Sequence, residues 1–153
     1  MNEKAIDSYY RINYLTASPL KLIALCYDQA IAHLKAARDA YARNDFATKG
    51  QRLTKVLDII HELNVSLDLE QGGEIARNLR RLYAYMLRTL TDADLKRDWK
   101  AFDHIVKLLE ELADAWHTIS AEAIKEEERH PSPPPHPYGV RQAPTASARI
   151  WQV

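Results

Sequence analysis

The sequence predicts an all-α protein, an antiparallel up-down-up-down four-helix bundle. Three observations carry this prediction: apolar residues recur at alternating steps of three and four, they do so over four long segments, and the links between these segments are short. Short links make consecutive helices antiparallel neighbours, and this spacing suits helices that cross at about 20°. No segment shows the alternating pattern of a strand.

The first helix is expected to begin at Ser18-Pro19. The Ser18 hydroxyl can accept an amide hydrogen bond as the N-cap, and Pro19 suits the first helical position, where the amide needs no partner. The pattern breaks at Asn44-Asp45. The apolar residues of this predicted helix share one face, which consists of Ile23, Tyr27, Ala30, Leu34, Ala37 and Tyr41.

The second helix is expected to start near Asp45. Gly50 lies in its first turns and should weaken it by about 1 kcal/mol relative to alanine. Gly72-Gly73 is predicted to end this helix and form the corner of a helical hairpin, because glycine adopts left-handed backbone at no steric cost. Glu74 would then restart the chain as a helix. The predicted apolar stripe is Leu53, Leu57, Ile60, Asn64 and Leu67.

The third and fourth helices are separated by a polar turn predicted at residues 92–98. The stripe of the third helix is Ile75, Leu79, Leu82, Met86 and Leu90, with Tyr83 and Leu87 beside it. The stripe of the fourth helix is Phe102, Ile105, Leu109, Leu112, Trp116 and Ile119. Each of these faces is wide enough to bury against neighbouring helices.

The length of 153 residues suggests one domain, which we divide into three parts. Residues 1–15 form a leader that is too apolar for a free tail and is expected to dock on the body. Residues 16–128 form the bundle. Residues 129–153 form a tail predicted to be disordered and partly polyproline-like, since it holds six of the seven prolines. Alternatively, the tail ends in a docking peptide built on Ile150, Trp151 and Val153.

Composition excludes several classes of function. The formal net charge is zero, which argues against binding to nucleic acid or to anionic membranes. The single cysteine, Cys26, cannot form an internal disulfide, and we expect a small buried side chain there rather than a reactive thiol. The start of the chain does not read as a signal peptide, and no apolar run approaches membrane-span length. These features favour a cytoplasmic location without membrane insertion.

The sequence contains no complete motif for catalysis or for metal or cofactor binding. Helical carboxylate metal sites use Glu-x-x-His pairs, and this chain has Asp58-x-x-His61 and Asp114-x-x-His117. Helical geometry turns both aspartates away from the predicted core, so we expect solvated flank residues, no metal, no cofactor and no enzyme. A calcium loop starting at Asp68 fails because Leu79 stands where the closing glutamate belongs.

Charge and tyrosine content are the remaining features of the surface. The third helix is basic and the fourth acidic, which indicates solvated faces or flanks that steer neighbouring helices, a partner or a second copy in a homodimer. There are eight tyrosines against two phenylalanines. Tyrosine is favoured where one end of the side chain is buried and the other is wet. The charged residues are Arg77, Arg80, Arg81 and Arg88 on the third helix and Glu110, Glu111, Asp114 and Glu122 on the fourth.

Several segments together resemble the flagellin-specific export chaperones of bacterial flagellar assembly, the FliS family. The most specific combination is Gly72-Gly73-Glu74-Ile75-Ala76 followed by Leu82-Tyr83-x-Tyr85-Met86. The resemblance runs from about residue 5 to 124 in one register. Further matching segments are Tyr9, 16–23 with Tyr27-Asp28, Ser66-Leu67-Asp68, and Ala113-Asp114-Ala115-Trp116 with Ile119-Ser120.

The resemblance implies a helical bundle without enzymatic activity. It implies a cytosolic chaperone that binds the disordered C-terminal segment of flagellin, prevents its premature polymerisation and presents it to the export gate. It further implies a leader that covers an apolar pocket, with Ile6, Tyr9 and Tyr10 as the covering residues. The groove for the client is expected to be built from Leu22, Tyr27, Leu57, Ile60, Leu63, Leu67, Ile75, Leu79, Tyr83 and Met86.

Two alternatives stay open at this point. One is a structural or regulatory bundle that binds another amphipathic helix. The other is a helical metal protein, against which the Asp-x-x-His geometry already argues. The residues that form the groove, the oligomeric state and the role of the tail are not determined by these patterns.

Overall fold

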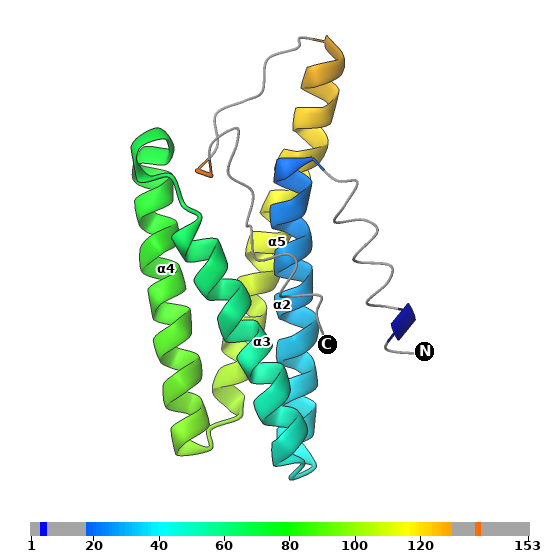
Figure 1. Cartoon of the computed structure of the whole chain (residues 1–153), viewed down its shortest axis with the longest axis vertical. Coiled ribbons are helices and arrows are strands. Elements are labelled where there is room, and N and C mark those ends of the chain that lie inside the picture. The colour runs from blue at the N-terminus through cyan, green and yellow to red at the C-terminus, as the bar shows by residue number, and fades with distance from the viewer. Residues whose placement is uncertain (1–3, 6–17, 130–136, 139–153) are drawn as a thin grey trace.

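The computed structural model describes residues 4–5, 18–129 and 137–138. Within these ranges the chain forms four helices: α2 (Pro19–Ala42), α3 (Phe46–Val65), α4 (Leu69–Lys96) and α5 (Lys100–Arg129). Figure 1 shows them running alternately down and up, each beside the next in sequence, with α5 returning to lie against α2. The predicted all-α antiparallel bundle is therefore confirmed. No helix among the described residues is long and apolar enough to cross a membrane.

The start of α2 is capped as the sequence predicts. Ser18 is the N-cap, and its hydroxyl accepts the amide of Lys21 at 3.3 Å, while Pro19 occupies the first turn. The chain leaves α2 through Asn44, which has a left-handed φ of 58°, and the Asp45 amide donates to the Ala40 carbonyl. This closed turn lets α3 start at once, with Asp45 as its N-cap.

The turn between α3 and α4 differs from the prediction. Helix α3 ends at Val65, and the reversal takes place over residues 66–68, not at Gly72-Gly73. Asp68 caps α4 by accepting the amides of Glu70 and Gln71. Leu67 therefore lies in the turn and not on a helix. The aspartate cap is a stronger start signal than the glycine pair is a stop signal, which explains the early restart.

Gly73 instead breaks helix α4 after its first turn. Its φ of 53° and ψ of −131° are non-helical, so the helix is interrupted at Gly73 and resumes at Glu74. The prediction of left-handed backbone at this pair is correct for Gly73, whereas the predicted corner is wrong.

The turn between α4 and α5 is shorter than predicted. Helix α4 continues through the predicted turn to Lys96, and only residues 97–99 separate the helices. Arg97 adopts a φ of 56°, and the Asp98 amide donates to the Ala93 carbonyl, a helix end that usually uses glycine.

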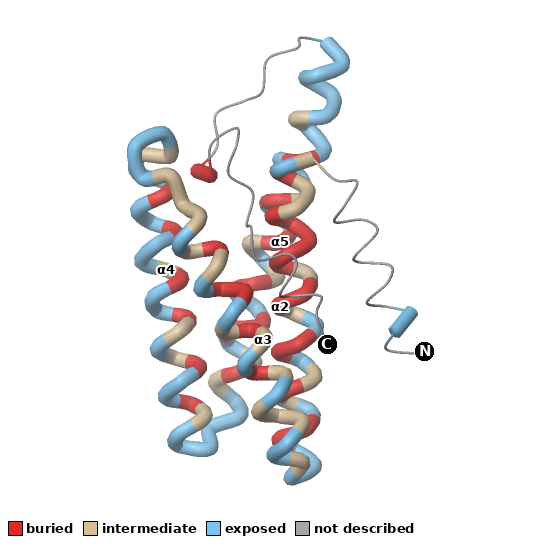
Figure 2. Tube along the Cα trace, in the orientation of Figure 1, coloured by how far each residue is buried: buried red, intermediate tan, exposed pale blue. Residues whose placement is uncertain are grey.

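The core lies between the four helices, as the buried inward faces in Figure 2 show. Most residues of the predicted stripes are buried, but the assignment of Ile75 and Ile119 to the core is wrong, because they are 62% and 41% exposed. The buried stripes run instead through Ala76 in α4 and Ser120 in α5, one residue further along each helix, which turns Ile75 and Ile119 outward. Helix α2 packs extensively on α3 and α5, whereas α4 touches α3 and α5 much less.

Candidate client-binding site

A cluster of aromatic side chains fills the bundle near the α3–α4 turn. The Tyr27 ring of α2 lies 6.4 Å from both the Tyr83 ring of α4 and the Trp116 ring of α5. The hydroxyls of Tyr27 and Tyr83 are 2.5 Å apart, so one donates to the other. Burial raises the pKa of both phenols well above 10, so both stay protonated and form a neutral hydrogen-bonded pair.

A fourth aromatic residue completes the cluster and comes from the predicted disordered tail. Tyr138 is fully buried, with its hydroxyl 2.6 Å from that of Tyr83 and its ring 5.7 Å from the Trp116 ring. Its neighbour Pro137 accepts a hydrogen bond from the Asp68 amide at 2.9 Å. The prediction of a disordered tail did not include this contact of Pro137 and Tyr138 with the bundle. The prediction for the rest of the tail, including Ile150, Trp151 and Val153, lies outside the described residues.

The position of Pro137 against α4 requires a glycine at residue 72. A Cβ placed on Gly72 would lie 2.7 Å from the Pro137 Cα and 2.6 Å from the Ala76 Cβ, both closer than real contacts. Gly72 thus allows the tail backbone to approach the first turn of α4. The glycine pair has two distinct uses: Gly72 provides space and Gly73 provides an unusual backbone conformation.

The predicted groove residues separate into two groups. The first group is inside the core and consists of Tyr27, Ile60, Leu63, Leu79, Tyr83 and Met86. The second group is partly or largely exposed and consists of Leu22, Leu57, Leu67 and Ile75. The covering residues predicted in the leader, Ile6, Tyr9 and Tyr10, lie outside the described part of the chain.

Three of the four accessible groove residues come together at one end of the bundle. Leu22 is in the first turns of α2, Leu67 is in the α3–α4 turn, and Ile75 follows the kink in α4. This end, at the top of Figure 1, also contains the C-terminal half of α5 and the docked Pro137–Tyr138. We call it the turn end. Its other exposed apolar side chains are Val65, Leu69, Ile119 and Ile124.

Two buried polar atoms near the turn end have no hydrogen-bond partner among the described residues. They are the Asn64 Oδ1 at the end of α3 and the Ser120 Oγ in α5. Buried polar groups are normally paired, so an unpaired oxygen is an exception that needs a reason. These two oxygens could accept hydrogen bonds close to the exposed apolar residues of the turn end.

His117 corrects a second expectation, because it is not a solvated flank residue. Its Nε2 lies 2.9 Å from the carboxylate of Asp28, and its Nδ1 lies 3.1 Å from the Lys21 Nζ. With Nε2 donating and Nδ1 accepting, a neutral imidazole satisfies both partners and ties α5 to α2. Asp114 and His61 are exposed as predicted, and no group of residues suited to holding a metal is found in the described ranges.

Cys26 is a buried thiol, as predicted. Burial raises its pKa from 9.0 to about 12, and the negative charges of Asp28 and Glu62 act in the same direction. A thiol that stays protonated is a poor nucleophile.

The basic face of α4 and the acidic face of α5 do not pair with each other. In the described part of the chain, no ion pair joins the arginines of α4 to the acidic residues of α5. Arg77 pairs with Glu74 on its own helix, and Glu110 pairs with Lys35 of α2.

Comparison with known proteins identifies the family. The model described as "Flagellar protein FliS" matches residues 1–123. The chain belongs to the FliS family. The flagellar secretion chaperone FliS of Salmonella typhimurium is 41% identical over 75% of this chain and 86% of its own length. FliS of Vibrio cholerae is 37% identical over 69% and 78%, and FliSB of Pseudomonas aeruginosa is 36% identical over 76% and 96%.

Membership of the FliS family gives the general function of the chain. The FliS relatives are named flagellar secretion chaperones, so this chain belongs to a family of chaperones and not to a known family of enzymes. The family match ends at residue 123, so Pro137 and Tyr138 lie beyond it. Sequence reasoning missed these two residues and concentrated on Ile150 and Trp151. The available signal was a tyrosine, an interface-prone side chain, within a stretch otherwise dominated by proline.

Proposed function

We propose that this FliS-family chain is a cytoplasmic chaperone for flagellin. It binds the disordered C-terminal segment of flagellin, prevents premature polymerisation, and supports delivery to the flagellar export gate. The observation that carries the proposal is the presence of Ile75 and other exposed apolar side chains, together with the half-buried Leu22 and Leu67, at the turn end of a bundle from this family.

The chemistry of the turn end suits a segment that becomes helical when bound. An amphipathic helix docks by placing apolar side chains at helical spacing against apolar side chains of its partner. Val65, Leu69 and Ile75 are 36–62% exposed and would be covered. Ordering a disordered client costs several kcal/mol, so a contact extending along the bundle is needed to offset it. The sparse packing of α4 makes it the helix that can shift most easily to extend that contact.

The proposal is tested by calorimetry with a peptide of the flagellin C-terminal segment. We expect saturable binding to the wild type and binding weakened about tenfold or more in Ile75→Asp, because a charge would face the client's apolar side chains. Ile75 is largely exposed, so this change should leave the fold intact.

The matched control is Leu95→Asp. Leu95 is 79% exposed on the same helix but at its opposite end, so this variant should bind like the wild type. Equal weakening in both variants would move the site away from the turn end. No binding by the wild type at about tens of micromolar would remove flagellin as the client and favour a bundle that binds another helix. A possible homodimer stays a prediction, which the same samples test by sedimentation.

A further inference from the structure

The tail segment Pro137–Tyr138 occupies a pocket in the same region as the proposed client site. The pocket has walls from three places: Tyr83 and Gly72 of α4, Trp116 of α5, and Asp68 in the turn before α4. The contacts are of three kinds, namely ring packing, a hydroxyl hydrogen bond and a backbone hydrogen bond. A pocket that satisfies both the ring and the hydroxyl of one side chain is suited to tyrosine.

We propose that Pro137–Tyr138 is an intramolecular ligand that closes this pocket and must leave before a client can occupy the turn end. The competition part rests on the function proposed above, whereas the occupancy of the pocket by the tail does not. The occupant is the chain's own tail, bound in cis.

Tyr138 closes the space between α4 and α5. Its side chain is fully buried between α4 and α5, the pair of neighbouring helices with the least direct contact. The Tyr138 ring therefore fills space between α4 and α5 that side chains of these two helices do not fill. When Tyr138 leaves, the Tyr83 hydroxyl keeps its hydrogen bond with Tyr27, so Tyr83 does not become a buried hydroxyl without a partner.

The docked segment described in the tail is only Pro137–Tyr138, so its release from the pocket is feasible. Only residues 130–136 separate these two residues from the end of α5 along the chain. A short tether gives an effective concentration on the order of millimolar, enough for a weak ligand to stay bound in cis. A client that covers much more of the bundle than one tyrosine can still displace it.

The first test concerns the pocket alone and uses the full-length chain. A synthetic peptide of residues 131–144 is titrated into the wild type and into Tyr138→Ala. We expect binding to Tyr138→Ala, whose pocket is vacant, and at least about tenfold weaker binding to the wild type, because the tail already fills it. The same peptide with Tyr138 replaced by alanine is the control and should not bind either protein.

The second test detects the closed state through the backbone hydrogen bond between Asp68 and Pro137. The Asp68 amide donates to the Pro137 carbonyl, so its hydrogen exchange in the wild type should be slow and should become at least about tenfold faster in Tyr138→Ala. Gly72→Ala offers a second route, since its Cβ would collide with Pro137 while Tyr138 stays intact. Tyr138→Phe retains the ring and keeps the assay informative if Tyr138→Ala fails to fold, and it should show intermediate exchange.

The third test adds the flagellin peptide. If the tail fills nine-tenths of the pockets, Tyr138→Ala should bind the client on the order of tenfold more tightly than the wild type. Equal client affinities would overturn the competition, and failure of the tail peptide to bind Tyr138→Ala together with unchanged Asp68 exchange would overturn the occupancy. If neither protein binds flagellin while the tail peptide still binds Tyr138→Ala, the proposed client is wrong and the cis ligand stands.

Discussion

At the scale of single residues, three glycines show how differently one residue type can act. Gly50 lies inside α3 with no heavy atom within 4 Å of where a Cβ would be. Gly72 is crowded by Ala76 and Pro137, and Gly73 has a positive φ. The cost of adding a methyl group therefore depends on position: helix propensity decides at Gly50, sterics at Gly72 and backbone conformation at Gly73.

The pair Gly73→Ala and Gly50→Ala tests this distinction. Gly73→Ala should lower the free energy of unfolding by about 1–3 kcal/mol, because its backbone region is strained for any residue with a Cβ. Gly50→Ala should raise the free energy of unfolding by up to about 1 kcal/mol, because alanine favours the helix and meets no obstacle. Urea unfolding followed by circular dichroism measures both changes. A Gly73→Ala variant as stable as the wild type would show that α4 can run straight through the kink.

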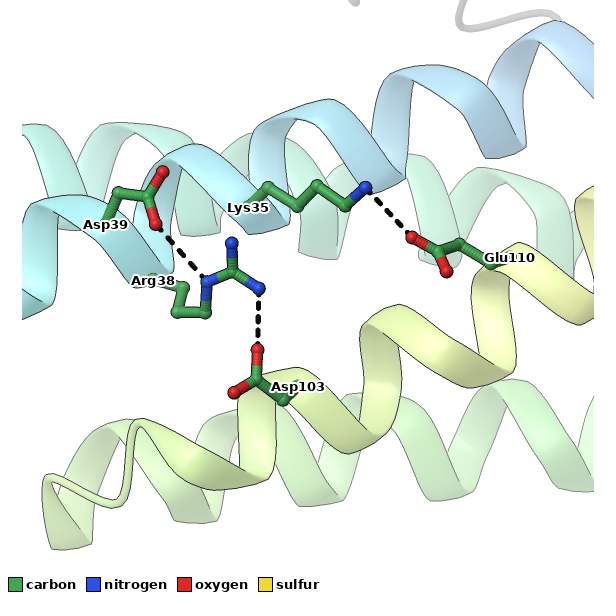
Figure 3. A network of polar contacts seen from close by, with 5 residues as sticks. All are labelled: Lys35, Arg38, Asp39, Asp103 and Glu110. Atoms are coloured by element: carbon green, nitrogen blue, oxygen red, sulfur yellow. Dashed lines mark hydrogen bonds and ion pairs between the residues drawn. The ribbon is translucent and has the colours of Figure 1, made fainter.

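At the scale of elements, ion pairs join the helices in addition to the core. Figure 3 shows Arg38 and Lys35 of α2 reaching Asp103 and Glu110 of α5, at 2.6 and 2.9 Å. These pairs are half exposed, so each should contribute modestly to stability. Their value is orientation, since they set α5 against α2 along the same flank that the His117–Asp28 contact continues.

One ion pair between α3 and α4 should contribute more than the others. Lys49 lies 2.6 Å from Asp94, with side chains only 16% and 32% exposed, and the Lys49 ammonium also lies 5.5 Å from the centre of the Tyr41 ring. A double-mutant cycle with Lys49→Met and Asp94→Asn should give a coupling energy of about 1 kcal/mol or more, since screening by water is reduced.

The matched control for this cycle is Lys96–Asp92 at the exposed end of α4. These side chains are 71% and 59% exposed at 3.0 Å, so their coupling energy should be about 0.5 kcal/mol or less. Coupling of equal size in the two pairs would mean that burial does not strengthen the contact between α3 and α4.

At the scale of the whole molecule, the interior contains ionisable groups held in neutral form. Burial raises the pKa of Cys26, Tyr27, Tyr83 and Tyr138, in the case of Cys26 to about 12. The unfolded chain releases these protons at lower pH than the folded chain does. Folding stability is therefore unaffected by these groups below about pH 9 and falls as the pH rises from there towards 12.

Alkaline unfolding of the wild type and Cys26→Ala measures this effect. Between pH 9 and 11 the free energy of unfolding should fall more steeply in the wild type, by up to about 1.4 kcal/mol per pH unit, because only the wild type carries the thiol. The difference between the two proteins should be constant from pH 6 to 8, which corrects for the cavity that the substitution leaves. Parallel curves throughout would mean that the Cys26 thiol titrates normally in the folded chain.

The sequence by itself determined the number, direction and inward faces of the helices. These follow from local information: the 3–4 apolar spacing, the caps at Ser18 and Asp45, and the short links. The family too could be named from motifs, the most specific of which lie within α4. Even the errors at this level are local, since the competition between the Asp68 cap and the Gly72-Gly73 pair involves neighbouring residues.

Only the tertiary structure decided which apolar residues are available to a partner. Tyr83 and Ile75 occupy the same predicted stripe, yet one is buried and the other largely exposed, because the buried face of α4 runs through Ala76 and leaves Ile75 beside it. It also decided that Tyr138 joins Tyr83 and Trp116 and that His117 meets Asp28. These contacts join residues that are 22–89 positions apart in the sequence, or involve a tail segment without periodic apolar residues. Their energy depends on neighbours that only folding brings together, so the local sequence pattern does not predict them.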